Sequence, residues 1–299
     1  MNPAKNTSTH TQLAKSVCRR RISMEDEDTP RLVWEKVEQS GNVPSARSGH
    51  SFTALGNTAY LFGGLAKSIP PAPNNDLYLM RMSTASYRWS RVKRITGQPP
   101  APRWDHTFTL FGLNQFLVFG GRVSKNNQNN ETWILDIMGE KWVCLFGTKP
   151  YQVGDNPRYQ IPHVFPDTPA PRAGHTAINV NDRIFVFGGF GGFGYTREEM
   201  NDLFVFDARR ELGDKQWHAL FPDGKAPSPR SGHSCALVAE TKLFVFGGWN
   251  KSRQFNDLNI YDTKTNRWSN PHCNFGPCRW NHSSVAVESS NPASEESSI

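Results

Sequence analysis

The stretch Lys242–Asp262, "KLFVFGGWNKSRQFNDLNIYD", decides the fold because its parts recur along the chain. An apolar run ends at a Gly-Gly pair, a variable loop follows, and Asn-Asp opens a second apolar run. Residues Arg183–Asp207, "RIFVFGGFGGFGYTREEMNDLFVFD", repeat this order. Alternating apolar residues on both sides of the loop predict two adjacent β-strands.

The same unit occurs four times, and each copy begins with an Arg-x-x-His motif followed by Ser or Thr. The motif starts at Arg47, Arg103, Arg172, Arg230 and, in a fifth copy, Arg279. Each of the first four units closes on a tryptophan, namely Trp89, Trp142, Trp217 and Trp268. We expect four strands per unit: strand a follows the His, strand b ends at Gly-Gly, strand c follows the Asn, and strand d carries the Trp. Such a small sheet cannot bury both faces alone, so the units must pack on one another. Radial packing gives a β-propeller, with one unit per blade.

These motifs resemble those of the kelch-repeat family, whose central fold is galactose-oxidase-like. The variant with "PRxGHS" and "NDLxxYD" is similar to kelch repeats of Rab-effector, cell-polarity and phosphatase-linked proteins. The resemblance implies an all-β propeller over residues 31–287, with four complete four-stranded repeats and a partial fifth. We expect residues 1–30 and the acidic, Ser-rich residues 288–299 to be disordered tails. Ser23, after "RRRI", is a candidate phosphorylation site on the first tail.

The ring is not expected to close within this sequence. Trp34 has the setting of a strand d, and residues 279–287, "RWNHSSVAV", supply only a strand a. Strands a and d are not neighbours in a blade. Three explanations stay open: the chain is truncated from a longer protein, it forms an irregular ring with two stray strands, or another chain completes the incomplete blade by self-association.

The candidate binding surface lies on one face of the propeller. Because strands alternate in direction, the b–c loops and the d–a segments share that face, and loops on a rigid scaffold carry binding residues. The b–c loops contain cations that would suit an acidic peptide, although solvated loop charge is the alternative. Tryptophans that depart from the repeat are candidate interface anchors. The predicted partner-binding residues are Lys67, Trp104, Arg122, Lys125, Arg197, Trp249, Lys251, Arg253 and Trp280.

We therefore predict a non-enzymatic interaction scaffold for a protein partner, in the cytoplasm or alternatively the nucleus. One alternative is the regulatory part of a larger enzyme, such as a kelch-linked phosphatase. Another is a metal-dependent enzyme of the galactose-oxidase or specifier type. No catalytic set, cofactor or metal site is expected, since Cys273 and Cys278 with His272 and His282 lack the paired spacing of a zinc site. The net charge of +7 comes without a concentrated basic stripe, which disfavours nucleic-acid binding, and no apolar run suits membrane insertion.

Overall fold

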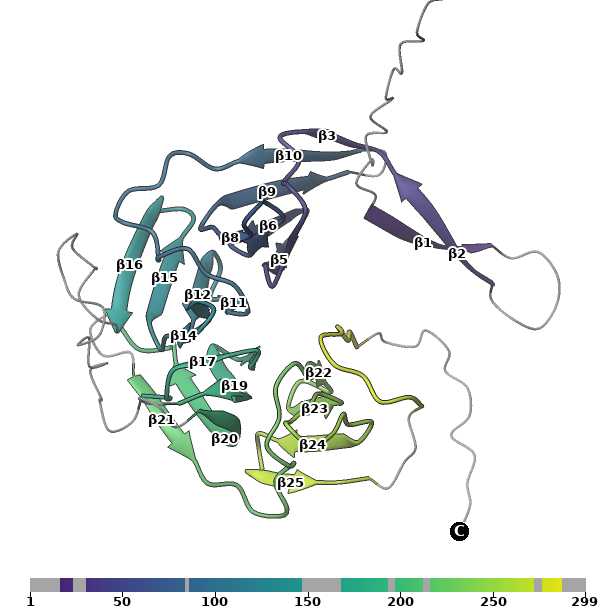
Figure 1. Cartoon of the computed structure of the whole chain (residues 1–299), viewed down its shortest axis with the longest axis vertical. Coiled ribbons are helices and arrows are strands. Elements are labelled where there is room, and N and C mark those ends of the chain that lie inside the picture. The colour runs from purple at the N-terminus through teal and green to yellow at the C-terminus, as the bar shows by residue number, and fades with distance from the viewer. Residues whose placement is uncertain are drawn as a thin grey trace, which may run out of the picture.

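The computed structural model describes residues 17–23, 31–83, 86–146, 168–192, 197–211, 216–271 and 276–286. In these residues it is all-β, and four sheets, each built on four antiparallel strands, stand side by side in an open arc (Figure 1). Each sheet has the order a-b-c-d. The all-β, kelch-type propeller predicted from the repeats is confirmed.

Each blade is one repeat of the sequence. The first blade contains β5 (Ser51–Leu55), β6 (Thr58–Phe62), β9 (Leu77–Met82) and β10 (Tyr87–Arg91). The second contains β11 (Thr107–Phe111), β12 (Gln115–Phe119), β15 (Thr132–Asp136) and β16 (Lys141–Phe146). The third contains β18 (Thr176–Val180), β19 (Arg183–Gly191), β20 (Glu198–Asp207) and β21 (Gln216–Leu220). The fourth contains β22 (Ser234–Val238), β23 (Lys242–Phe246), β24 (Leu258–Asp262) and β25 (Arg267–Ser269).

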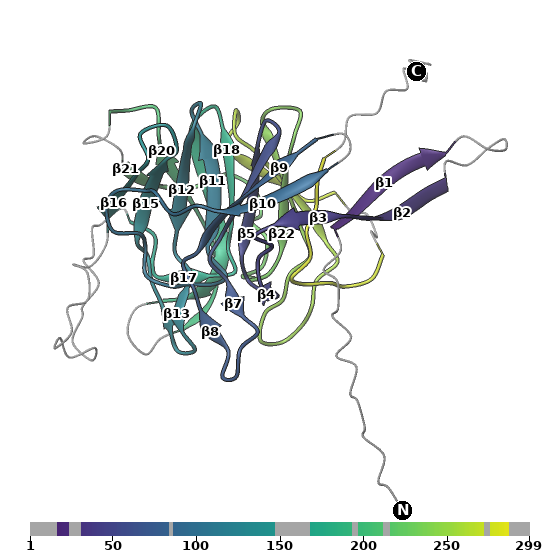
Figure 2. The ribbon, with the colours of Figure 1, turned by 90° about the horizontal axis from the view of Figure 1, so that it is seen from above.

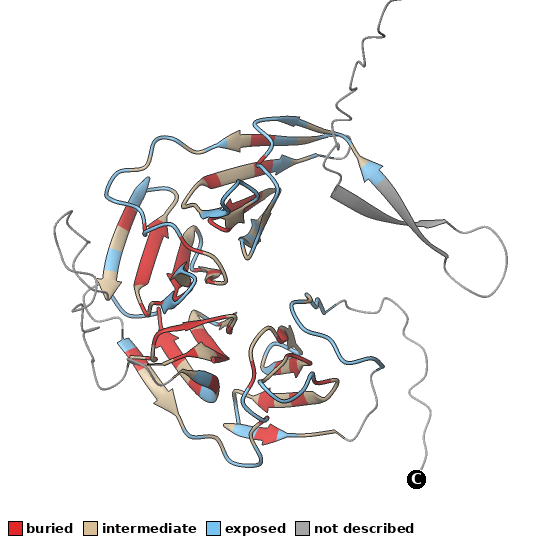
Figure 3. Ribbon diagram, viewed as in Figure 1, coloured by how far each residue is buried: buried red, intermediate tan, exposed pale blue. Residues whose placement is uncertain are grey.

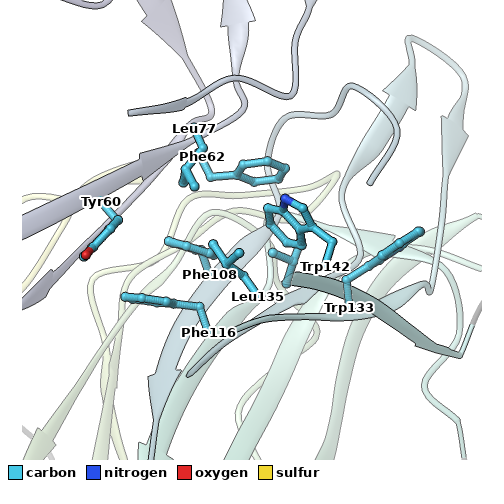
Figure 4. Close-up of a cluster of buried hydrophobic side chains, with 9 residues drawn as sticks. Tyr60, Phe62, Leu77, Phe108, Phe116, Trp133, Leu135 and Trp142 are labelled. Atoms are coloured by element: carbon cyan, nitrogen blue, oxygen red, sulfur yellow. The ribbon is translucent and has the colours of Figure 1, made fainter. Parts of the chain in front are cut away.

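The hydrophobic core lies between blades, where the buried residues of neighbouring sheets meet (Figure 3). In the first three blades the Phe before Gly-Gly packs on the strand-d Trp of the next blade. Phe62 lies 5.3 Å from Trp142 between ring centroids, in the cluster of Figure 4, and Phe119 lies 4.6 Å from Trp217. Aromatic pairs at this spacing add to the apolar burial. The repeated Phe and Trp therefore bind each blade to its neighbour.

A buried arginine ties the loops of each blade together. Arg172 is fully buried, and its guanidinium donates to the carbonyl of Gly188 at 3.0 Å and to both carboxylate oxygens of Asp202 at 2.7 and 2.8 Å. The same contacts to the first glycine and to the acidic or amide group before strand c occur at Arg47, Arg103 and Arg230. Bidentate, charge-assisted hydrogen bonds compensate the guanidinium for its loss of water. The Arg of one motif and the Asp of another are thus partners.

The asparagine before that acidic residue links consecutive blades. Asn75 donates to the carbonyl of Pro100 at 2.9 Å, and Asn201 donates to that of Pro227 at 3.0 Å. In both cases the acceptor lies in the d–a segment that leads to the next blade. The Asn side chain therefore reaches beyond its own blade to the segment that precedes the next one.

The repeated histidines form a second link between blades. The Nε2 of His106 lies 2.8 Å from the Ser51 hydroxyl, and that of His233 lies 2.9 Å from Thr176, each in the preceding blade. Burial, followed by the nearby arginine, lowers the pKa of His106 and of His233 to about 3. These side chains are therefore neutral at pH 7, as a structural hydrogen-bonding role requires.

The glycine pair is needed because the chain turns sharply against its neighbours. Gly188 has φ +64°, and a Cβ there would lie 2.9 Å from the Arg230 carbonyl oxygen and 3.0 Å from Cε1 of His233. Any larger residue would meet backbone in a left-handed conformation, which only glycine adopts freely.

The arc is open between the fourth and first blades. The inner strands contact one another in the order β5, β11, β18 and β22. The sheet face of the fourth blade that lies away from the third blade is less buried than the matching face of the third blade. Phe246 is half-buried there, whereas Phe187 at the matching position is 2% exposed. On the first blade, Phe52 is 49% exposed beside Trp89. The described residues thus contain two sheet faces that no further blade covers.

The fifth motif is docked but forms no strand, which corrects the expected strand a. Arg279 N donates to Phe255 O at 3.1 Å, and the Nε2 of His282 lies 2.9 Å from the Ser234 hydroxyl, as in complete blades. Residues 281–286 have no β-structure. Strand a pairs only with strand b in the other blades, and without a strand b there is no ladder to join.

The N-terminal part differs from the expected tail and stray strand. β1 (Val17–Ser23) pairs antiparallel with β2 (Arg31–Val37), so part of residues 1–30 is a strand and Ser23 lies at its end. Trp34 belongs to β2, whose partner among the described residues is β1 rather than a strand c. Two runs of residues with high β-propensity, joined by a short connection, favour this hairpin. The domain boundaries at residues 30 and 287 stay predictions.

After the hairpin the chain follows the outer edge of the first blade. β3 (Gln39–Gly41) pairs in parallel with β10, and the bridges of Thr96 with Lys141 and of Asp223 with Arg267 repeat this path in later blades. The part of the chain that the structure describes contains no helix long and apolar enough to cross a membrane.

We predict that lowering the pH destabilises the propeller through its buried histidines. Unfolded histidine has a pKa near 6.5, so between about pH 6.5 and pH 3 the unfolded state binds more protons and the free energy of unfolding falls with pH. Urea unfolding at a series of pH values should show a smaller loss for His106→Asn than for the wild type. His218→Asn is the matched control, and an unchanged slope in His106→Asn would contradict the assignment.

Removing the acidic partner of a buried arginine should be far more costly than removing a surface carboxylate. Asp202→Ala leaves the Arg172 guanidinium buried without its two carboxylate bonds, which we expect to cost about 3 kcal/mol of unfolding free energy. Glu198→Gln, on the exposed side of the same strand, is the control. Equal midpoints in a denaturant titration of the two variants would show that the ion pair contributes little.

Candidate functional site

The b–c loops and d–a segments form a second, smaller layer on one face of the propeller. In the first blade it is the sheet of β4 (Arg47–Ser48), β7 (Leu65–Ala66) and β8 (Ala72–Pro73). In the second it is β13 (Arg122–Ser124) with β14 (Asn127–Gln128), and in the third β17 (Arg172–Ala173) extends the ends of β19 and β20. Figure 2 shows β4, β7, β8, β13 and β17 together at one end of the molecule. The described part of the loop face therefore has a hydrogen-bonded backbone of its own.

A chain of backbone hydrogen bonds crosses the centre of this face from blade to blade. Asp105 N donates to Gly49 O at 2.8 Å, Gly174 N to Asp105 O at 2.9 Å, Gly232 N to Gly174 O at 2.8 Å, and Asn281 N to Gly232 O at 2.7 Å. All five residues have positive φ. Asp and Asn tolerate this conformation better than other non-glycine residues, which explains why they replace glycine in two copies.

A pocket of about 280 Å³ lies against these central turns. Its lining residues come from the second to fifth repeats. Its lining comes from three kinds of position: the central turns, the residue after Gly-Gly, and the strands that flank the b–c loops. The lining residues are Asp105, Arg122, Ala173, Gly174, Phe190, Glu199, Ser231, Gly232, Trp249, Lys251, Trp280 and Asn281.

The cations of the pocket are already engaged within the protein. Arg122 Nε lies 3.3 Å from Asp105 Oδ2, and its guanidinium lies 5.7 Å from the centre of the Phe190 ring. Lys251 Nζ donates to the carbonyl of Arg197 at 3.1 Å. Burial raises the pKa of the Asp105 carboxyl, and the Arg122 charge opposes that rise.

Two tryptophans form an aromatic wall. The rings of Trp249 and Trp280 lie 5.9 Å apart between centroids and are tilted by 35°. Trp280 is 49% exposed, although it belongs to the docked fifth motif. An exposed indole pair beside a pocket is the kind of surface that protein partners use as an anchor.

The structure brings together some of the predicted site residues. Arg122, Trp249, Lys251 and Trp280 line the pocket, and Arg197 contacts Lys251. Trp104 does not line it: the Trp104 backbone pairs with Arg122, and its Cβ lies toward Gly49 of the first blade. The remaining predicted residues, Lys67, Lys125 and Arg253, are exposed on the loop face outside the lining. Most of the long d–a connection, residues 147–167, lies outside the described residues.

The sequence-based list missed Phe190 and Glu199. Glu199 pairs with Phe190 in the β-ladder, is 8% exposed, and its Oε1 has no hydrogen-bond partner among the described residues. The same register position is Pro73, Gln128 and Gln254 in the other blades. An alignment of the repeats would have revealed this residue. Two positions before the Asn that precedes strand c, Glu199 is charged where the other copies are neutral.

The described residues contain no group of three or more His, Cys, Asp or Glu side chains placed to hold a metal ion. His272 and Cys273 of the sequence cluster fall outside those residues. Nε2 of each docked histidine from His106 to His282 faces a Ser or Thr hydroxyl of the preceding blade.

Comparison with known proteins agrees with this geometry. The KLHDC2/KLHL20/DRC7 Kelch-repeats domain matches residues 23–158 and 151–291. The chain is 31% identical over 251 residues to the flagellar outer arm dynein alpha chain of Chlamydomonas reinhardtii, covering 80% of this chain and 5% of that protein. It is 30% identical over 227 residues to Kelch domain-containing protein 3 of Rattus norvegicus, covering 73% of this chain and 52% of that protein.

A further relative is Host cell factor of Drosophila melanogaster, which is 28% identical over 267 residues, or 79% of this chain and 16% of that protein. The chain thus spans about half the length of Kelch domain-containing protein 3 and smaller shares of the other two. The matched domain covers nearly all of the repeats, and these repeats form the four-stranded blades of a kelch-type propeller. The chain therefore belongs to the kelch-repeat family.

Proposed function

We propose that this chain is a non-enzymatic interaction scaffold that binds a protein partner through its b–c and d–a loop face. Kelch-repeat proteins are generally interaction or adaptor proteins, so the family supports a protein partner. The observation that carries the choice of face is the pocket there, with the half-exposed Trp280 ring beside the Trp249 ring. The opposite face consists of short a–b and c–d turns.

The hydrogen-bonded backbone of the described loop face supports this proposal. Buried arginines hold each b–c loop to its blade, so the outward side chains are displayed with little loss of chain entropy on binding. The exposed cations Lys67, Lys125 and Arg253 lie on b–c loops of the same face, outside the pocket lining. They would attract an acidic segment of a partner over a longer range.

A second candidate is that the propeller serves as the interaction module of a larger protein, such as the regulatory part of an enzyme. The matched region is 5% of the dynein alpha chain and 16% of Host cell factor, so similar repeats occur within much longer proteins. Binding through the loop face would be the same in both cases. The cytoplasmic or nuclear location stays a prediction.

Trp249→Ala and Trp280→Ala should each weaken partner capture. We expect the free energy of unfolding of Trp280→Ala to stay within about 0.5 kcal/mol of the wild type, because half of its surface is already exposed. Quantitative affinity capture followed by mass spectrometry, together with urea unfolding of each variant, measures both quantities.

Leu113→Ala is the matched control, since Leu113 is a 90% exposed apolar residue in an a–b turn of the opposite face. Partners that depend on the proposed face are lost with either tryptophan variant and retained with Leu113→Ala. A set of partners lost only with Leu113→Ala would assign binding to the other face.

A further inference from the structure

We propose that the pocket binds a cationic side chain, arginine or lysine, of a partner polypeptide, with Glu199 as its counter-ion and Trp249 and Trp280 as its aromatic wall. This inference rests on the proposed function and specifies the chemistry of the same face. It differs from the acidic ligand that the loop cations had suggested.

The first step of the argument is the balance of charge inside the pocket. Two carboxylates, of Asp105 and Glu199, and two cations, of Arg122 and Lys251, line it. Arg122 is paired with Asp105, and Lys251 donates to a backbone carbonyl. Glu199 is different, because its Oε1 accepts no hydrogen bond from the described residues.

The second step is the unfavourable free energy of burying that oxygen without a hydrogen bond. Glu199 is more than nine-tenths buried, and a buried carboxylate oxygen without a partner is unfavourable because it has lost water without gaining a hydrogen bond. A guanidinium or ammonium group entering the pocket would supply the missing donors and the opposite charge. The described residues thus leave this one carboxylate oxygen, Oε1 of Glu199, without a hydrogen-bond donor.

The third step is the aromatic part of the pocket lining. Trp249 and Trp280 line the same pocket with their rings 5.9 Å apart, and indole faces attract cations more strongly than other aromatic rings. An aromatic surface together with one buried carboxylate favours a cation with an aliphatic stem. An acidic side chain would instead meet Glu199 and Asp105.

The fourth step comes from the repeat itself. In the second and fourth blades the position of Glu199 is Gln128 and Gln254, which are similar in shape but neutral. The blade architecture therefore accepts glutamine at this register position. Glu199→Gln removes the charge while keeping the side chain that sister blades carry.

The test uses fluorescence anisotropy with dye-labelled, terminally blocked peptides of the form Gly-Ser-Gly-X-Gly-Ser, where X is arginine, lysine, norleucine or glutamate. We expect the full chain to bind the arginine and lysine peptides at least about tenfold more tightly than the norleucine peptide, which corresponds to about 1.4 kcal/mol. Glu199→Gln should abolish this preference. Glu198→Gln, a change of the exposed neighbouring carboxylate, should retain it.

Every other pattern overturns the inference. Equal binding of the norleucine and arginine peptides would show that charge is not recognised, and preference for the glutamate peptide would assign the pocket to Arg122 and Lys251. Retained preference in Glu199→Gln would place the cation elsewhere, and absence of binding by all four peptides would remove the subsite. In each of these cases the broader proposal is still judged separately, by partner loss in the tryptophan variants.

Discussion

The fold depends on a buried arginine at the start of each complete repeat. The Arg172 guanidinium joins three segments that are distant in sequence: its own d–a segment, the Gly-Gly turn and the start of strand c. Removing a guanidinium from water is costly unless its donors are satisfied, so the three segments must keep one arrangement. The loops between these segments can then vary in sequence, because the arginine holds the backbone at both ends of each loop. This separation gives the propeller a constant frame and a variable face.

The blades are coupled through a few repeated contacts, which makes the structure nearly one-dimensional. Phe on Trp, His to Ser or Thr, and the central turn hydrogen bonds each connect only adjacent repeats. Docking of the Arg279 motif follows from this, since it needs only the fourth blade. The same logic explains the open arc: each terminal blade keeps one sheet face without the neighbour that the inner blades have. Phe52 and Phe246 lie on these two faces and are more exposed than their equivalents.

The repeat predicted the blades well because period, glycine pair and tryptophan are local patterns. It did not predict that Arg172 and Asp202 are partners, since the two residues are 30 positions apart and belong to different motifs. Strand a of the fifth repeat failed for a related reason: a run of β-forming residues becomes a strand only where a ladder accepts it. At the site, the Trp249 and Trp280 rings lie 5.9 Å apart between centroids, a proximity that the separate motifs did not predict. Trp104 occupies the same repeat position as Trp280, but its Cβ lies toward the first blade, outside the pocket lining.

The pocket also shows why net charge is a poor guide to the polarity of a binding site. The chain is basic overall, and cations outnumber acids in its b–c loops. Yet Arg122 and Lys251 are engaged within the protein, whereas the Glu199 carboxylate lies buried in the lining with an oxygen that the described residues leave without a hydrogen bond. A ligand recognises the charges that remain after internal pairing, and these can have the opposite sign to the total. Outer cations then act on the approach of a partner at long range, while the pocket selects the group that enters it. A partner segment that combines acidic residues with a central arginine or lysine would satisfy both parts of this face.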